Sequence, residues 1–516
     1  MITRFRRLAA VLLLLALALS LTGVAAAPQP GVVSLDILTV NDFHGALAAE
    51  GKNPGAAALA AYLRAERDKN PDGTLILSAG DMFQGTPDSN LLRGKTVVAV
   101  MNAVGFDAMA LGNHEFDWGL DVLRERMAQA AFPMLSANIL DRSSGRRAEL
   151  VAPYVIVERD GVKIAVVGLT TPDTAVTTNP RNVQNFVFAD PAATLKALIP
   201  ELKAKGADVV VALAHLASYP GEPPTGEAAD LAAAAGSDLA AVVSGHSHLK
   251  VAGKVSGVPL VQAYYNGRSV AAVHIAYSAA SGEVLGATVE VKDVPPGLVP
   301  DKRVAAIVAA AQSEIAPVKG LILGRAETAL PHDRFQLSPL GQWATDAMRQ
   351  AAKADIALCN GGGLRTGLAA GTVTLGDMYA VMPFDNDLFV AEMTGAQVLA
   401  ALEHGIANPK YGTLQFSGLT VDYRAAAPAG RRVAAATMAD GSLLAADKTY
   451  LVAVSDFLIA GGDGYDMIKA AARHTNTFLT LRDALAEAVR KAGVIRFRGD
   501  GRLKELSRSA ALFIAA

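Results

Sequence analysis

The chain of 516 residues contains a single cysteine, Cys359. One cysteine cannot form an internal disulfide, so the fold has to be stabilised by its buried cores and by any metal that binds. Charge is also scarce, because only 19% of the residues are charged and the two signs nearly cancel to a net charge of −2. This balance excludes long-range attraction to nucleic acid, and an anionic ligand has to be held by a local site.

Long apolar runs are absent after the first 27 residues. Within them, a basic head is followed by the apolar stretch Leu8 to Leu21 and by the small residues Ala25 to Ala27. This order is typical of a cleaved signal peptide, and the apolar stretch is too short to span a bilayer. The alternative is an uncleaved membrane anchor. We expect a periplasmic or secreted protein with no stable membrane insertion after cleavage.

Hydrophobic residues make up 51% of the chain, a composition typical of a globular α/β protein. The length is too great for a single core and predicts two domains. From residue 32 onwards, short aliphatic runs such as "TLILSAG" and "DVVVALAHL" alternate with amphipathic runs such as "AAALAAYLRAER", which predicts sheets covered by helices. The segment "VPLVQAYYNGRSVAAVHIAY" predicts a pair of strands that turn at Asn266-Gly267.

Three prolines near residue 296 precede one helix-like run, which is typical of an interdomain connector. A second α/β unit follows it. We therefore predict a signal peptide over 1–27, a first domain over 32–295, a linker helix over 296–320 and a smaller second domain over 321–500.

Polar side chains gather where the predicted strands of the first domain end. The motifs "NDFHG", "GDMFQGTP", "GNHEFDWG", "ALAHL" and "SGHSH" bring Asp42, His44, Asp81, Asn113, His114, Asp117, His215, His246 and His248. In open α/β sheets ligands bind beyond the carboxyl ends of the strands, so these loops can converge. Each motif alone is explained by a turn or by a hydrogen-bonded core histidine. Together, however, they hold five of the nine histidines.

Carboxylate, amide and imidazole ligands suit divalent ions of the zinc, manganese, cobalt or iron class. The set exceeds what one tetrahedral ion needs. It fits two ions about 3.5–4 Å apart, with one carboxylate between them. The cofactors we expect are therefore two divalent metal ions.

These motifs, in this order, resemble the calcineurin-like metallophosphoesterase signature, and the whole chain is similar to the 5′-nucleotidase family. The resemblance implies a four-layer α/β/β/α domain followed by a smaller α/β substrate-binding domain. It also implies the metal ligands: Asp42, His44, Asp81 and His248 for one ion, and Asp81, Asn113, His215 and His246 for the other. His114 would stabilise the phosphoryl transition state or protonate the leaving oxygen, and Asp117 would orient it. For Glu115 we expect only a structural hydrogen bond.

The second half contains "NGGGLR", "PFDN" and "FLIAGGDGY". A glycine triple alone is most often a plain loop, but these motifs resemble the nucleotide-binding domain of the same family. By this resemblance Phe384 and Phe457 sandwich the base and Asp463 accepts hydrogen bonds from the ribose. Asn360 contacts the nucleoside and Arg365 the phosphate side. Gly363 belongs to the same substrate-binding set, and Arg334 aligns with another arginine of the family. Two features depart from the family: "QLSPLGQW" replaces its usual residues after Arg334, and Asp385 and Asp387 add negative charge around Phe384.

The expected function is that of an exported hydrolase. Hydroxide generated at the two metals attacks the phosphorus of a nucleoside 5′-monophosphate. The resemblance also implies that the second domain rotates about the connector. The alternatives are a 2′,3′-cyclic-nucleotide phosphodiesterase/3′-nucleotidase, a UDP-sugar hydrolase and, from another class, a non-catalytic nucleotide-binding protein. In each case the partner is a small-molecule nucleotide.

Overall fold

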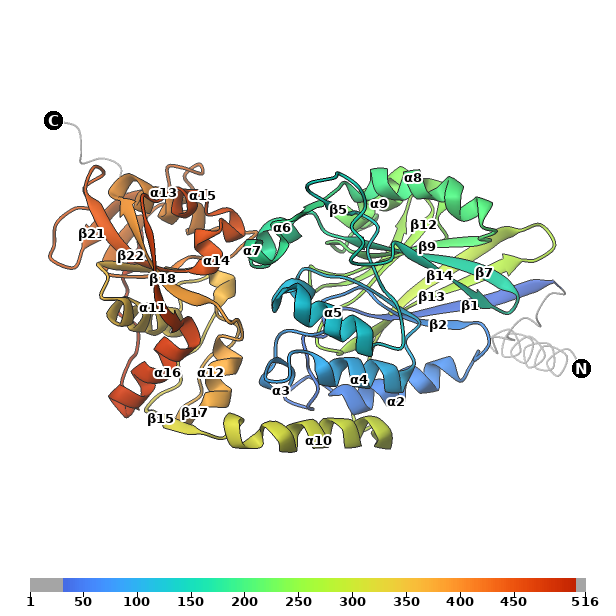
Figure 1. The fold of residues 1–516 in the computed structure, drawn as a ribbon, viewed down its shortest axis with the longest axis horizontal. Coiled ribbons are helices and arrows are strands. Elements are labelled where there is room, and N and C mark those ends of the chain that lie inside the picture. Colours follow the sequence, from blue (N-terminus) through green and yellow to red (C-terminus); the bar gives the residue numbers. More distant parts are fainter. Residues whose placement is uncertain (1–30, 507–516) are drawn as a thin grey trace, which may run out of the picture.

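The structure, a computed structural model, describes residues 31–506. The chain forms two halves that lie side by side, and one long helix runs along the underside of the first half toward the second (Figure 1). The predicted signal peptide lies outside the described residues. Within the range that is described, no helix is both long enough and apolar enough to cross a membrane.

The N-terminal half is built on two six-stranded sheets. The first sheet has the order β14 (Glu283–Asp293), β13 (Ser269–Ser278), β1 (Val32–Val40), β2 (Thr74–Ser78), β3 (Ala108–Ala110) and β4 (Met134–Leu135). The second has the order β11 (Lys250–Val255), β12 (Val258–Ala263), β10 (Ala241–Ser244), β9 (Val209–His215), β7 (Val162–Thr170) and β6 (Tyr154–Arg159).

The two sheets pack face to face, and helices cover both outer faces. One core lies between the sheets and includes Ile37 and Val211. A second lies under α2 (Ala56–Arg67), α4 (Lys95–Val104) and α5 (Gly119–Gln129), and a third lies under α8 (Pro191–Ala204) and α9 (Glu227–Ala235). The predicted four-layer α/β/β/α fold is confirmed.

The strand directions bring the polar loops together. Strands β1, β2 and β3 are parallel neighbours, and so are β7, β9 and β10. Their carboxyl ends therefore open on the same edge of each sheet. The motifs that follow β1, β2, β3, β9 and β10 all lie at these ends.

The predicted pairing of the two strands around Asn266-Gly267 is wrong. Both residues adopt the left-handed turn conformation, with φ of 54° and 65°. However, β12 pairs with β10 and β11, whereas β13 pairs with β1 and β14 in the other sheet. One side of each strand faces the core between the sheets, and the turn carries the chain from one sheet to the other.

The C-terminal half has a central five-stranded sheet with a core on each face. The sheet has the order β19 (Gln415–Ser417), β16 (Ile356–Cys359), β22 (Thr449–Ser455), β18 (Asp387–Thr394) and β23 (His474–Thr480). Helices α11 (Pro339–Ala352), α12 (Leu375–Val381) and α16 (Leu481–Ala492) cover one face. Helices α13 (Gly395–Gly405), α14 (Asp456–Ile459) and α15 (Asp466–Lys469) cover the other. Alternation along β16 sends Ile356 and Leu358 into one core and Ala357 and Cys359 into the other.

Two three-stranded sheets complete this half. One has the order β17 (Gly371–Thr374), β15 (Ile322–Ala326) and β24 (Val494–Ile495). The other has the order β21 (Val433–Met438), β20 (Leu419–Tyr423) and β25 (Leu503–Glu505).

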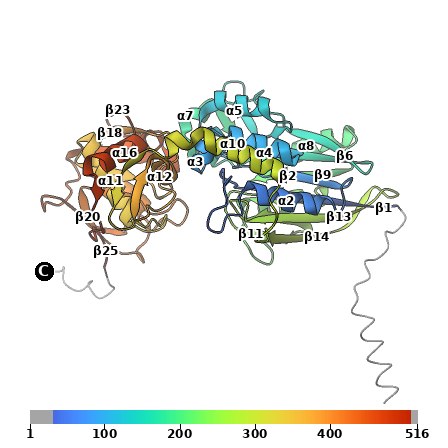
Figure 2. The ribbon, with the colours of Figure 1, turned by 90° about the horizontal axis from the view of Figure 1, so that it is seen from below.

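The connecting helix α10 (Lys302–Lys319) belongs by packing to the N-terminal half. Asp301 caps it by accepting a hydrogen bond from the Val304 amide, 2.9 Å away. Val304 and Val308 are buried in the same core as α2 and α4, and Figure 2 shows α10 lying across α4. Lys319, its last residue, pairs with Asp88. We keep the predicted division (32–295, 296–320 and 321–500) as a proposal.

Candidate metal centre and active site

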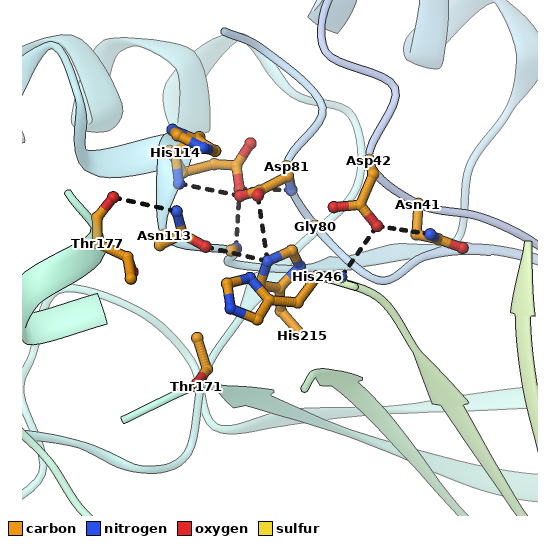
Figure 3. Close-up of polar contacts among 12 residues, drawn as sticks. Asn41, Asp42, Gly80, Asp81, Asn113, His114, Thr171, Thr177, His215 and His246 are labelled. Atoms are coloured by element: carbon orange, nitrogen blue, oxygen red, sulfur yellow. Dashed lines mark hydrogen bonds and ion pairs between the residues drawn. The ribbon is translucent and has the colours of Figure 1, made fainter. Parts of the chain in front are cut away.

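The predicted metal ligands share an unusual backbone conformation. Five of the seven have positive φ: Asp42 (49°), His44 (50°), Asp81 (55°), His246 (76°) and His248 (57°). Each such non-glycine residue costs roughly 1–3 kcal/mol and persists only where the surroundings enforce it. The sharp turns aim these side chains back across the strand ends toward one another, as Figure 3 shows for Asp42, Asp81 and His246.

The structure gathers the ligands into two adjacent clusters. Asp42, His44 and His248 form one, and Asp81, His215 and His246 form the other, with the donor atoms of each cluster within 4.8 Å of one another. In the first, His44 Nε2 lies 3.0 Å from His248 Nε2, which lies 3.3 Å from Asp42 Oδ1. In the second, His215 Nε2 lies 3.2 Å from both Asp81 Oδ2 and Asn113 Oδ1. Each cluster contains three residues of one predicted ligand set, and the assignment of these residues to two metal ions stays a prediction.

The remaining polar atoms of these ligands are held by the backbone. His44 Nδ1 donates to the Gln84 carbonyl at 2.8 Å, and His215 Nδ1 donates to the Ala79 carbonyl at 2.7 Å. These bonds leave Nε2 of each ring as the lone-pair atom, which is how metal-binding histidines are oriented. Asn41 donates to Asp42 Oδ2 at 2.6 Å, a contact that its position beside Asp42 in "NDFHG" could have suggested.

The electrostatics of the clusters fit dications. Burial lowers the pKa of His44 to about 3 and that of His246 to about 4, which keeps both rings in the neutral form that binds a metal. Burial also lowers the pKa of His215, but Asp81, Asp42 and the Ala79 carbonyl together raise it to about 10. The buried Asp42 Oδ1 has no hydrogen-bond partner among the described residues. A buried carboxylate oxygen facing two imidazoles is a suitable cation ligand.

His114 and Asp117 lie beside the second cluster. Asp117 Oδ2 accepts from His114 Nδ1 at 2.7 Å, and Thr178 donates to the other Asp117 oxygen at 2.8 Å. Burial lowers the pKa of His114, but the carboxylates of Asp117 and Asp81 together raise it above its usual value. Asp117 thus fixes the tautomer of the ring and leaves Nε2 as the atom not engaged by it.

Glu115 makes the structural hydrogen bonds expected of it, but they reach outside its own turn. Its carboxylate accepts from the backbone amides of Asp81 (2.9 Å), Met82 (2.9 Å) and Gly112 (2.8 Å). Burial and the adjacent Asp81 charge raise the pKa of Glu115 to about 7, against the hydrogen bonds from the Asp81 and Gly112 amides, which lower it. Glu115 therefore ties the loop that carries Asp81 to the loop that carries Asn113.

A cavity of about 780 Å³ lies between the two halves. The N-terminal half contributes Asp81, Asn113, His114, Asp117, His246 and His248 to its wall, and the C-terminal half contributes every predicted substrate residue: Arg334, Asn360, Gly363, Arg365, Phe384, Phe457 and Asp463. Asp42, His44 and His215 are buried behind this wall. The Phe384 ring reaches across the boundary, with its centroid 6.1 Å from that of His114 and the two planes 27° apart.

The C-terminal wall combines two arginines with a buried acid. Burial and the neighbouring Arg334 lower the pKa of Arg365 to about 10. Burial raises the pKa of Asp463 to about 6, although it accepts a 2.6 Å hydrogen bond from Asn360 Nδ2. The negative charge expected at Asp385 is offset, because Arg482 pairs with this carboxylate.

Several contacts between the halves have no signal in the sequence. Lys410 pairs with Asp173 at 2.7 Å, and Asn179 donates to Asp456 at 3.0 Å. Asp173 and Asn179 flank the short helix α6 (Thr174–Thr177). Each pair joins residues more than two hundred positions apart, so no local sequence pattern predicts the contact.

Comparisons with known proteins give two family models. The model described as calcineurin-like phosphoesterase matches residues 35–250, and the model described as 5′-nucleotidase, C-terminal domain, matches residues 314–470.

The chain is also similar to named relatives over most of its length. It is 32% identical to the 5′-nucleotidase of Vibrio cholerae over 89% of this chain and 91% of that protein. It is 31% identical to the endonuclease YhcR of Bacillus subtilis over 93% of this chain, but it spans only 41% of that longer protein. Among solved structures, the 5′-nucleotidase precursor of Thermus thermophilus is 30% identical, with a TM-score of 0.79 over 92% of this chain and 100% of that one.

Proposed function

The chain belongs to the 5′-nucleotidase family and is a phosphoester hydrolase, and we propose that it is an exported enzyme of nucleotide catabolism that releases phosphate from nucleoside 5′-monophosphates. One observation carries this proposal: a single cavity has metal-ligand clusters on one wall and stacking, acidic and guanidinium side chains on the opposite wall. A nucleotide needs both walls. Its anionic phosphoryl group requires the wall that carries the metal-ligand clusters, and its planar aromatic base requires side chains that can stack on it.

On the N-terminal wall, the residues of the chain position the phosphoryl group and protonate the leaving oxygen. Two divalent ions, held by Asp42, His44, Asp81, Asn113, His215, His246 and His248, would supply the positive charge that activates water and neutralises the phosphoryl oxygens. His114 Nε2 donates a hydrogen bond, and finally a proton, to the leaving ribose oxygen. Asp117 holds His114 in place for this transfer and stabilises its charged form.

On the C-terminal wall the chain binds the rest of the nucleotide. Phe384 and Phe457 stack against the base, an interaction worth about 1–3 kcal/mol that tolerates different bases. Asp463 and Asn360 bind the ribose hydroxyls, and the glycine at 363 lets the backbone approach the nucleoside. Arg365 and Arg334 face the phosphate, where guanidinium forks match phosphate oxygens.

Replacing His114 by Ala tests the chemistry. We expect the turnover of AMP to fall by about a hundredfold or more, because proton transfer is lost, while metal content by mass spectrometry stays unchanged. Asp117→Asn should lower turnover less, since the ring is retained. Turnover by His114→Ala at the wild-type rate would contradict the role of His114.

A substrate panel separates the proposed reaction from its relatives. AMP, a 2′,3′-cyclic nucleotide and a UDP-sugar are incubated with protein that is stripped of metal and reloaded with manganese, zinc or cobalt. Preferred release of phosphate from AMP supports the proposal. Preferred hydrolysis of the cyclic nucleotide or of the UDP-sugar would make that reaction the function instead. Nucleotide binding without any hydrolysis would favour a binding protein.

A further inference from the structure

One buried amide in the catalytic cavity has no assigned partner. Gln84 is only 1% exposed, and neither Oε1 nor Nε2 of its side chain forms a hydrogen bond within the described residues. Gln84 is also one of the residues that line the cavity between the two halves. Buried polar groups are nearly always hydrogen-bonded in folded proteins. An unpaired amide at a cavity wall therefore points to a ligand that completes it.

The backbone of Gln84 is fixed against the metal-ligand cluster. Its carbonyl accepts the His44 Nδ1 hydrogen bond at 2.8 Å. The next residue, Gly85, has a φ of 156°, and a Cβ there would lie 2.6 Å from His44 Cβ. This close approach needs glycine. The backbone of Gln84 is thus held beside His44, one of the predicted metal ligands.

The loop of Gln84 also faces the C-terminal half. Asn90 in α3 (Pro87–Asn90) accepts from the Gly85 amide at 3.0 Å, and its own amide donates to the Pro383 carbonyl, 3.4 Å away. Pro383 precedes Phe384, which lies against His114. Arg365 lines the same cavity from the C-terminal half. A phosphoryl group between the metal ligands and Arg365 would therefore come within the region that Gln84 borders.

We propose that Gln84 is a substrate-binding residue whose Nε2 donates a hydrogen bond to a phosphoryl oxygen of the nucleotide. This inference rests on the proposed function. A phosphate monoester dianion offers only acceptors, so it needs the donor of the amide, and a neutral donor adds a hydrogen bond without adding charge beside the metals. The ribose-binding residues Asn360 and Asp463 belong to the opposite half, which favours phosphate over ribose as the partner.

The test uses direct binding of inorganic phosphate and of adenosine to the manganese-loaded protein, measured by calorimetry. Gln84→Met retains the length of the side chain but removes both polar atoms. We expect its phosphate affinity to fall about tenfold to a hundredfold, the usual effect of losing a hydrogen bond to a charged group. Adenosine affinity and metal content should stay unchanged. Gln184→Met, at an exposed site outside the cavity, is the matched control and should bind phosphate as the wild type does.

The outcomes separate this inference from the proposed function. Wild-type phosphate affinity in Gln84→Met would overturn it, and so would a loss of adenosine affinity alone, because the amide would then serve the ribose. If Gln84→Met loses its metal or unfolds, Gln84→Glu becomes the test variant. A carboxylate of the same shape cannot donate a hydrogen bond and repels phosphate, so phosphate binding should be abolished. A wild-type protein that binds phosphate but hydrolyses no nucleotide refutes the proposed function and leaves the role of Gln84 to the binding data.

Discussion

Asp463 is the residue whose protonation should control nucleoside binding. It is 6% exposed and has left-handed φ of 52° within the short turn η4 (Gly462–Gly464). Burial raises its pKa to about 6, against the hydrogen bond from Asn360 and the charges of Arg334, His404 and Arg365. If the ionised carboxylate accepts from ribose hydroxyls, binding weakens as the pH falls through about 6. At pH 5 we expect adenosine affinity to be about tenfold lower than at pH 7.

The measurement is the dissociation constant of adenosine between pH 5 and pH 8. Asp463→Asn should bind weakly and without this pH dependence, since an amide does not titrate in this range. His404 Nε2 donates to the backbone carbonyl of Asp463 at 2.8 Å, so His404→Gln is the control that keeps a donor and removes the imidazole. A pH profile that vanishes in His404→Gln but persists in Asp463→Asn would assign the effect to His404 instead.

Residue type and position were enough to predict which side chains meet in the two clusters, and their role as metal ligands stays a prediction. Aspartate or histidine after a single strand has an ordinary structural explanation, but five such loops at the ends of neighbouring strands are hard to explain without a shared site. Gln84 offered no comparable signal. A glutamine is common in loops, and only its burial without a partner singles it out. Such a property depends on neighbours that are distant in sequence.

At the scale of elements, Glu115 joins the loops after β2 and β3. Its three backbone hydrogen bonds hold the turn at Asp81, which has left-handed φ of 55°. In Glu115→Gln one carboxylate oxygen becomes an amide donor that opposes a backbone donor. We expect a loss of about 1–3 kcal/mol in the free energy of unfolding and weaker binding of metal, measured by thermal unfolding in chelator and by metal titration.

The exposed Glu149 provides the comparison for this change. Glu149→Gln removes the same charge without touching a buried amide and should leave both quantities unchanged. Equal unfolding curves and equal metal affinity for Glu115→Gln and the wild type would show that the two loops hold Asp81 without help from Glu115.

Elements were predictable where one local pattern determines them. The aliphatic runs that end in polar turns became β1, β2, β9 and β10, and the last three are buried along their whole length. The turn at Asn266-Gly267 was also predicted, but the pairing of its strands was not. Turn residues fix a change of direction, whereas two facing sheets decide which partners the next strand finds.

At the scale of the molecule, the fold class followed from alternation and from the family resemblance, but the contact between the halves did not. Asp456 immediately precedes Phe457 and accepts from Asn179 of the N-terminal half and from Asn386 of its own half, at 3.0 Å and 2.8 Å. Arg181 lies 3.9 Å from the same carboxylate, and its guanidinium sits 5.3 Å from the Phe389 ring centroid. The short helix α7 (Pro180–Val183) and the residue before it thus contact the C-terminal half beside Phe457, the residue proposed to stack on the base.

This contact predicts that Asn179 stabilises the arrangement in which the two halves contact each other, here called the closed state. In Asn179→Ala the buried Asp456 loses its partner from the N-terminal half, so the state in which the halves separate becomes less costly. We expect a larger radius of gyration in X-ray scattering without ligand. The KM for AMP should rise severalfold with little change in kcat, because the closed state, once formed with substrate, keeps its catalytic groups.

The control is Asn185→Ala. Asn185 is exposed nearby in the same segment, and its replacement should change neither the radius of gyration nor the KM. If scattering and KM of Asn179→Ala equal those of the wild type, the contact does not govern closure and the pairing of Lys410 with Asp173 becomes the next candidate.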